Sequence, residues 1–218
     1  MGKLIVIEGL DGSGKATQAE LLYKFLSENG EYKAVRKVSF PDYDSPSSSL
    51  VKMYLAGEFG KRAEDVNAYA ASSFYAVDRY ASFKRDWEND WKRGIVIADR
   101  YTTSNAIHQC SKLPQSEWDN FIDWLFEYEY KLIGIPAPET TVYLSVAPEV
   151  SQRLLIERYS GEDKRDIHEK DIAYLEKCRA AAAYCAEKLG WRVVECCENG
   201  TMRSKESIQF DIRRVISE

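Results

Sequence analysis

The sequence has few histidines and cysteines and no long apolar run, so it lacks features that structural zinc sites and membrane-spanning helices require. It contains two histidines and five cysteines in 218 residues, and no CxxC pair, so no structural zinc site is expected. We interpret the odd number of cysteines as reduced, buried or incidental thiols. No apolar run approaches the ~18 residues that a membrane-spanning helix needs. The sequence therefore predicts no membrane partner.

Positive charge is also scarce. Thirty Lys and Arg residues are outnumbered by 35 Asp and Glu residues, which gives a net charge of −5. Proteins dedicated to nucleic acids are usually basic, so no nucleic-acid partner is expected. A small phosphorylated ligand is compatible with this charge, because it needs only a local basic pocket. The first apolar stretch is too short for a signal peptide and ends at Glu8, which favours a cytoplasmic location.

Short apolar runs alternate with amphipathic segments along the chain. The runs predict five strands, at Lys3–Glu8, Ala34–Phe40, Ile95–Asp99, Thr141–Val146 and Trp191–Glu195. Helical spacing predicts helices at Thr17–Asn29, Val66–Trp91 (one long helix or two closely joined), Ser116–Tyr130, Pro148–Tyr159, Asp171–Leu189 and Lys205–Ile216. This order predicts a single α/β domain over residues 1–218. We expect a parallel five-stranded sheet flanked by helices on both faces.

A glycine-rich loop joins the first predicted strand to the first predicted helix. Its sequence GLDGSGK, at Gly9–Lys15, fits the GxxxxGK phosphate-loop pattern. The glycines let backbone N–H groups turn toward phosphate oxygens, and the helix N terminus adds a favourable dipole. This context predicts a P-loop NTPase-type fold. The residues predicted to hold nucleotide phosphates are Gly9, Asp11, Gly12, Ser13, Gly14, Lys15, Ala16 and Thr17.

One position of this loop departs from the pattern. The residue after Lys15 is normally Ser or Thr, whose hydroxyl helps to hold Mg²⁺. Here it is Ala16, and its methyl group cannot bind a metal. Two alternatives remain open: carboxylates elsewhere hold the ion, or metal binding is weaker. The phosphate cradle does not depend on this hydroxyl.

A second polar motif, Asp99-Arg100-Tyr101, ends the third predicted strand. Ligands of parallel α/β sheets bind at the carboxyl ends of strands. We therefore expect Asp99 to face a metal ion and Arg100 to hold a phosphate.

Together these motifs resemble the thymidylate kinase family. The resemblance rests on Asp11 inside the phosphate loop, on the aromatic-xx-Asp-Arg pattern from Tyr75 to Arg79, and on the motif at Asp99. It extends from Gly2 to about Leu189. It implies phosphoryl transfer from ATP to dTMP, which gives dTDP and ADP, with Mg²⁺ as cofactor and a homodimer as the assembly.

The resemblance also implies roles for individual residues. Asp11 would lie near the 3′-hydroxyl of dTMP, Tyr75 would stack on thymine, Arg79 would donate to a base carbonyl and Arg100 would bind the acceptor phosphate. Tyr75 and Arg79 are four residues apart, so they project from one helix face. The other positions implied for dTMP are Ser104, Asn105, His108 and Gln109, with the Asn105 amide reading the pyrimidine edge.

A charged break in the chain, residues 158–166, resembles the lid that closes over ATP, placed near residues 157–168. Members without an arginine in the phosphate loop supply one from this lid, and position 12 here is glycine. The implied catalytic residues are Lys15, Asp99, Arg100, Arg158 and Arg165. The implied metal ligands are Asp11, Asp99 and Glu169.

Two positions differ from the pattern of many members. Tyr43 replaces an arginine that helps to hold the acceptor phosphate, so Lys37 or Lys52 would have to assist Arg100. His108 replaces an aromatic residue that crowds the 2′ position of the sugar. The alternatives are another nucleotide or deoxynucleoside kinase, and a nucleotide-binding regulator that has lost catalysis. Ala16 is the feature that favours the regulator.

Overall fold

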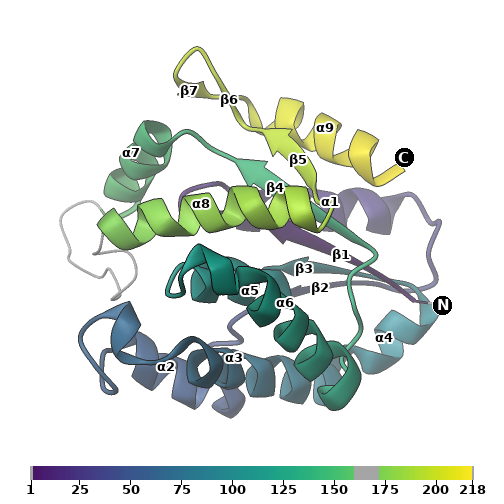
Figure 1. Cartoon of the computed structure of the whole chain (residues 1–218). Helices are drawn as coiled ribbons and strands as arrows, with labels where there is room; N and C mark the ends of the chain where they lie inside the picture. The colour runs from purple at the N-terminus through teal and green to yellow at the C-terminus, as the bar shows by residue number, and fades with distance from the viewer. Residues whose placement is uncertain (1, 160–171, 218) are drawn as a thin grey trace.

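The computed structural model describes residues 2–159 and 172–217. Its centre is a sheet of five parallel strands in the order β2-β3-β1-β4-β5 (Figure 1). The strands are β1 (Lys3–Glu8), β2 (Val35–Ser39), β3 (Ile95–Asp99), β4 (Thr140–Ser145) and β5 (Arg192–Glu195). Since β1 is central and pairs with both β3 and β4, its carboxyl end opens into the middle of the molecule.

Helices cover both faces of the sheet. They are α1 (Lys15–Glu28), α2 (Ser49–Leu55), α3 (Ala68–Ser82), α4 (Glu88–Arg93), α5 (Thr102–Cys110), α6 (Trp118–Phe126), α7 (Pro148–Tyr159), α8 (Ile172–Lys188) and α9 (Lys205–Ser217). Two π-helical segments, Phe83–Trp87 and Glu127–Ile133, follow α3 and α6. A small hairpin of β6 (Cys197–Glu198) and β7 (Thr201–Met202) precedes α9. Within the described residues, no helix has both the length and the apolar character needed to cross a membrane.

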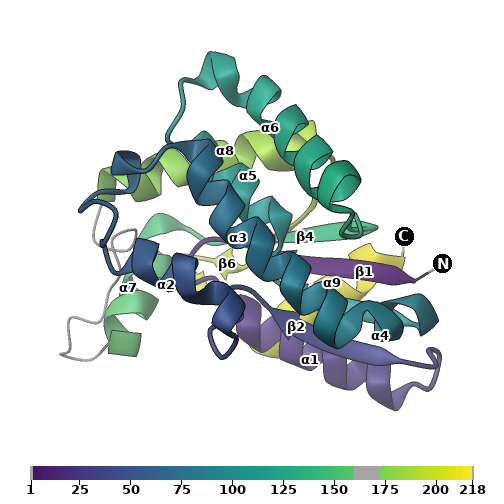
Figure 2. The same ribbon diagram turned by 90° about the horizontal axis from the view of Figure 1, so that it is seen from below.

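The strand residues alternate between two cores, as side chains of a strand must. Ile5 and Ile7 of β1 pack with α1 and α9, whereas Leu4 and Val6 pack with Trp87 and other residues on the opposite face. Figure 2 shows α6 and α8 on one side of the strands and α1 on the other. Both faces are thus buried, which explains why the four central residues of β1, Leu4 to Ile7, are all apolar.

The sequence-based fold prediction is confirmed: the sheet is parallel, five-stranded and flanked by helices. The Val66–Trp91 prediction corresponds to α3 continuing through a π-helical segment toward α4. Two helices were not predicted, α2 and α5. The sequence of α5, TTSNAIHQC, is rich in residues of low helix propensity, and burial between neighbouring helices stabilises it instead.

Candidate active site

The phosphate loop connects the end of β1 to the start of α1. Gly14 caps α1 in the left-handed region, at φ 81°, where a residue with a Cβ would be strained. A Cβ on Gly9 would come within 2.6 Å of the Ser13 hydroxyl, so only glycine permits this tight turn. Among the described residues no side chain caps the N terminus of α1. The backbone N–H groups of the first turn are therefore available to an anion.

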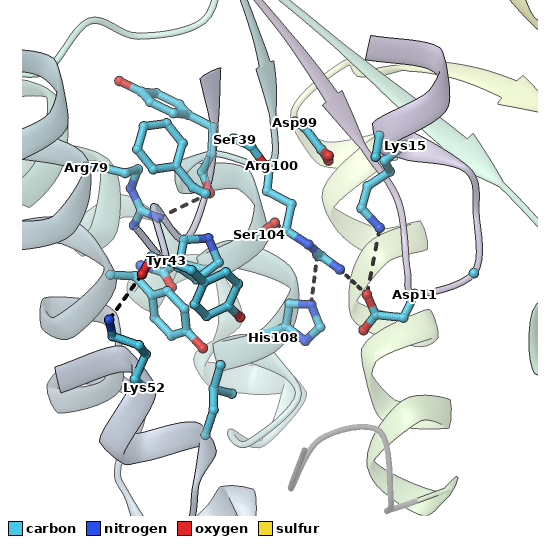
Figure 3. Close-up of a pocket in the computed structure, with 18 of the residues that line it drawn as sticks. Asp11, Lys15, Ser39, Tyr43, Lys52, Arg79, Asp99, Arg100, Ser104 and His108 are labelled. Carbon is cyan, nitrogen blue, oxygen red and sulfur yellow. Dashed lines mark hydrogen bonds and ion pairs between the residues drawn. The ribbon is translucent and has the colours of Figure 1, made fainter. Parts of the chain in front are cut away.

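A cluster of charges surrounds Arg100 at the open end of β1 and β3. Its guanidinium donates to Asp11, approaches Glu8 at 3.7 Å and donates to the Ser104 hydroxyl at 3.3 Å. Figure 3 shows Arg100 reaching between Asp11 and His108, whose Nε2 lies 3.4 Å from Nη1. Arg100 has a positive φ of 66°, which turns its side chain from the strand end toward the loop. The backbone is thus strained to bring this cation to the phosphate loop.

The protonation of this cluster follows from its burial and its charges. Burial would raise the pKa of Asp11, but Arg100 and Lys15 hold the pKa of that carboxyl well below its usual range. Burial and the Arg100 charge lower the pKa of Lys15 from 10.5 to about 8. The Lys15 Nζ donates to the Leu10 carbonyl at 2.9 Å and lies 3.9 Å from Asp11 Oδ1. The Lys15 ammonium group is therefore held inside the phosphate loop, where a bound phosphate is expected to lie.

The buried carboxylate of Glu8 connects the phosphate loop to α5 beside this cluster. The sequence analysis did not identify Glu8 as a site residue. Its carboxylate is fully buried, and it accepts from the Gly9 N–H at 2.9 Å, from Thr103 Oγ1 at 2.8 Å and from Ser104 Oγ at 2.7 Å. The hydrogen bond to Gly9 fixes the start of the phosphate loop. Those to Thr103 and Ser104 fix the first turn of α5. Glu8 thus holds the loop and the helix in one arrangement.

A cavity of about 970 Å³ extends from this cluster across the carboxyl edge of the sheet. Its walls come from the phosphate loop, from the segment after β2, from α2 and α3, from β3 and from α5. They include Asp11, Gly12, Gly14, Lys15, Ala16, Thr17, Tyr43, Lys52, Tyr75, Arg79, Asp99, Arg100, Ser104, Asn105, His108 and Gln109. The volume is that of a small-molecule site rather than of a packing defect.

The end of the cavity away from the phosphate loop contains a fully buried ion pair. Arg79 Nε and Nη2 donate to Glu129 at 2.7 and 2.6 Å, a two-pronged geometry, and both side chains are at most 2% exposed. Burial would lower the pKa of the guanidinium, but the Glu129 carboxylate raises it above its usual value. Asn105 joins the same carboxylate through Nδ2 at 3.2 Å. This end of the cavity is therefore held rigidly before any ligand arrives.

Comparison with known proteins places the chain in a family. A model of the thymidylate kinase family matches residues 7–208. Thymidylate kinase from Mycobacterium tuberculosis is 31% identical over 192 residues, which cover 86% of this chain and 87% of that protein. A probable thymidylate kinase from Methanothermobacter thermautotrophicus is 30% identical over 213 residues, 98% of this chain and 93% of that protein. The chain belongs to the thymidylate kinase family.

Solved structures of the family share the fold. The thymidylate kinase from Candida albicans superposes with a TM-score of 0.69 at 21% identity, covering 99% of this chain and 91% of that one. The thymidylate kinase from Ehrlichia chaffeensis gives a TM-score of 0.67 at 20% identity, covering 100% of this chain and 99% of that one. At these identities the likeness concerns the fold.

The structure brings most of the residues implied by the family resemblance to one cavity. Of those implied, Lys15, Asp99, Arg100 and the dTMP positions all line it, while Gly9 and Ser13 lie in the loop behind it. Gln109 is fully buried, and neither atom of its amide has a hydrogen-bond partner among the described residues. Such an amide is suited to a ligand that supplies the missing partners. The lid prediction, with Arg165, Glu169 and the side chain of Arg158, lies outside the described residues.

The structure separates the two lysines considered as assistants of Arg100. Lys52 lines the cavity and donates to the Tyr43 carbonyl at 3.1 Å, as Figure 3 shows. Lys37 instead pairs with Glu20 of α1 and does not line the cavity. Of the two lysines, therefore, Lys52 alone lines the cavity.

Two buried carboxylates of this family member, Glu8 and Glu129, were missed from the sequence. Glu8 ends β1 directly before Gly9, and a carboxylate at the carboxyl end of a strand could have been read as a site residue. Glu129 follows Leu125 by four residues, in the π-helical segment that continues the buried face of α6, where a charge is out of place. A charged residue that interrupts an apolar helix face could thus have pointed to Glu129.

Proposed function

We propose that this protein transfers a phosphoryl group from ATP to the 5′-phosphate of dTMP, giving dTDP and ADP. The observation that carries the proposal is the arrangement of one cavity. It has a phosphate loop at one end, Arg100 in the middle and the hydrogen-bonding side chains Arg79 and Asn105 at the other. A donor phosphate, an acceptor phosphate and a base can each find a matching group there.

The phosphate end would act by charge and position. Two anionic substrates repel one another, so their reaction needs cations that hold them in line. Lys15 and the uncapped start of α1 would hold the donor phosphates, and Arg100 the acceptor phosphate. Arg100 is bound to Asp11 in the structure, so an incoming phosphate would compete for its guanidinium. Asp11 would then be released toward the sugar hydroxyl that the family resemblance assigns to it.

The base end would recognise thymine by stacking and by hydrogen bonds. Tyr75 lines the cavity four residues before Arg79 on α3, and the ring of Tyr54 packs edge-on against it at 6.4 Å between centroids. Gln109 and His108 on α5 would face the base and the sugar. Ser104, which bridges Glu8 and Arg100, would fix the phosphate-binding guanidinium.

The residues present fit a Mg²⁺ ion. Asp99 lines the cavity at the end of β3, and among the described residues no hydrogen bond or salt bridge engages its carboxylate. Mg²⁺ prefers oxygen ligands and keeps several waters, so one or two carboxylates with phosphates suffice. We place Asp99 as the first protein ligand and Asp11, through its second oxygen, as the other. When bound, the ion would neutralise phosphate charge, held by these carboxylates in place of the hydroxyl that Ala16 lacks.

The test is ADP release from ATP with four acceptors: dTMP, dUMP, CMP and thymidine. We expect turnover with dTMP, weaker turnover with dUMP and little with CMP or thymidine. Preference for thymidine would identify a deoxynucleoside kinase, since that acceptor carries no phosphate for Arg100. Nucleotide binding without any turnover would favour the regulator instead. The wild-type protein thus separates the three alternatives in one assay.

Assembly and location complete the proposal. The family resemblance supports a homodimer, which sedimentation velocity over a range of concentrations would test. A single species at monomer mass would contradict it. Fractionation of cells that express the chain would test a cytoplasmic location.

A further inference from the structure

Glu129 lies in a π-helical segment, whose turns are wider than those of an α-helix. The π-helical segment Glu127–Ile133 continues α6, and single π-turns of this kind are frequent at functional sites. The Glu129 carbonyl accepts two backbone N–H groups, from Gly134 and from Ile135, both at 3.1 Å. These two hydrogen bonds fix the backbone of Glu129 against the residues that follow the segment, and its side chain is buried with no exposed surface.

The Glu129 carboxylate accepts four hydrogen bonds, the full number its two oxygens can take. Oε2 accepts from Arg79 Nε at 2.7 Å and from Thr102 Oγ1 at 2.8 Å. Oε1 accepts from Arg79 Nη2 at 2.6 Å and from Asn105 Nδ2 at 3.2 Å. Two of its three partners, Arg79 and Asn105, line the cavity, and Thr102 does not. One carboxylate thus orients two side chains that a ligand would touch.

These contacts decide which way the Asn105 amide points. Its Nδ2 donates to Glu129 Oε1 and to the Ser72 carbonyl, each at 3.2 Å. Both neighbours can only accept, so the nitrogen must face them and both of its N–H groups are used. The group that Asn105 has left to offer the cavity is the acceptor Oδ1.

The same contacts leave Arg79 as a donor. Two of its nitrogens bind Glu129, and the third, Nη1, makes one long hydrogen bond of 3.5 Å to the Tyr101 carbonyl. Nη1 therefore keeps an N–H for the cavity that Arg79 lines. The cavity end accordingly presents one acceptor beside one donor, in a fixed order.

We propose that Glu129 is a specificity-determining positioning residue, which sets this acceptor–donor order and so selects thymine or uracil over cytosine. The N3–H and C4=O groups of thymine and uracil complement Asn105 Oδ1 and Arg79. Cytosine offers an acceptor at N3 and a donor at its amino group, so both contacts would be mismatched. The choice of a pyrimidine as ligand rests on the proposed function, whereas the order of the two groups rests on the hydrogen bonds above.

The test measures binding of dTMP, dUMP and dCMP by calorimetry, which needs no turnover. We expect wild type to bind dTMP and dUMP ~100-fold more tightly than dCMP, because a mismatched buried edge leaves partners unpaired. Glu129→Gln places an amide N–H against a donor of Arg79 or Asn105. The ratio of dTMP to dCMP affinity should then fall ~10-fold or more.

Two further variants separate positioning from general damage. Thr102→Val removes one donor to Glu129 without touching Arg79, Asn105 or the cavity, so the affinity ratio should stay as in wild type although the melting temperature falls. Glu129→Asp keeps the charge but is one methylene shorter and cannot keep all four hydrogen bonds. Its ratio should lie between those of wild type and Glu129→Gln, and it carries the test if the Gln variant does not fold.

Three results would overturn the proposal: equal affinities of wild type for dTMP and dCMP, an unchanged ratio in both Glu129 variants that fold, or an equal fall in Thr102→Val. The proposed function fails separately. Wild type that binds dTMP selectively but releases no ADP from ATP in its presence would refute the kinase activity and leave the role of Glu129 standing.

Discussion

The two ends of the cavity are built on opposite principles. At the base end, Arg79 and Glu129 are buried and joined by two hydrogen bonds of 2.6 and 2.7 Å. At the phosphate end, Arg100 and Asp11 are 17% and 24% exposed, and Arg100 shares its guanidinium among several partners. At the base end the Arg79–Glu129 pair is complete without a ligand. The phosphate end contains pairs that a phosphate can replace.

This difference follows from what each end has to bind. A base is neutral and is recognised by the direction of its hydrogen bonds, so its partners must be held still. A phosphate is recognised by charge, and a cation without a partner would be costly in a partly buried site. Asp11 lowers that cost for Arg100 until a phosphate arrives. The base end is thus expected to contribute to stability, and the phosphate end to turnover.

The largest effect should come from breaking the buried pair. Arg79→Leu leaves the Glu129 carboxylate buried with its charge uncompensated, and such losses cost ~3–5 kcal/mol of unfolding free energy. Urea unfolding measures this value. The matched variant is Asp11→Asn at the phosphate end, where partial exposure and the Glu8 carboxylate, 3.7 Å from Arg100, should make the cost clearly smaller than in Arg79→Leu. Equal losses in the two variants would remove the distinction between the ends.

The next effect concerns turnover at the phosphate end. Lys15→Ala removes a cation from the phosphate loop and should lower kcat ~10²-fold or more, since charge contacts of this kind act mainly in the transition state. The unfolding free energy should change little by comparison. Lys24→Ala, on the exposed face of the same helix, is the control and should keep wild-type kcat. Wild-type turnover in Lys15→Ala would show that the loop does not bind the donor.

A smaller effect should appear as a pH dependence that only the phosphate end shows. The pKa of Lys15 is lowered from 10.5 to about 8, so its charge is present below that pH and lost above it. The value of kcat/KM for ATP, which reports the free enzyme, should therefore fall by up to about tenfold per pH unit above pH 8. In Lys15→Arg the charge persists, and the descending limb should disappear. An unchanged limb in that variant would assign it to another group.

The smallest effect should come from the position after Lys15. Ala16→Ser restores a hydroxyl and should lower the Mg²⁺ concentration for half-maximal rate a few-fold, whereas Asp99→Asn should raise it. Thr17→Val tests whether the neighbouring hydroxyl already serves the ion. A loss of Mg²⁺ dependence in Thr17→Val alone, with no change in Asp99→Asn, would contradict the carboxylate account. A Mg²⁺ titration of the four proteins decides this.

The phosphate end was predictable from sequence, because the residues of each of its motifs lie close together in the chain. An apolar strand, a glycine-rich turn and a helix start lie within a few residues, and each has its own pattern. The strand that ends at Asp99 was equally clear. The position of Arg100 against Asp11 follows from the parallel pairing of β1 with β3. The alternation of strands and helices predicts a parallel sheet but not which strands are neighbours.

The base end was predictable only in part. Arg79 and Asn105 came from a family resemblance, and nothing near either residue points to Glu129, which is 50 residues from Arg79 along the chain. The helix that carries Asn105 has too many β-branched and short polar residues for local propensity to reveal it. Buried polar networks of this kind depend on packing between distant segments. Which of their members pair with one another is established only once the fold is known.

The helix α5 also limits the distance between the groups proposed for the acceptor phosphate and for the base. It begins two residues after Arg100 and carries Asn105, so the group proposed for the base lies on a short rigid helix, with a rise of 1.5 Å per residue, that starts next to the group proposed for the acceptor phosphate. The separation of these groups cannot stretch to suit a longer ligand. If the base is held at Asn105, a second phosphate must extend past Arg100 into the loop that holds Lys15, where the donor belongs. We therefore expect α5 to favour an acceptor with one phosphate over the diphosphate product, so that each acceptor would receive a single phosphoryl group.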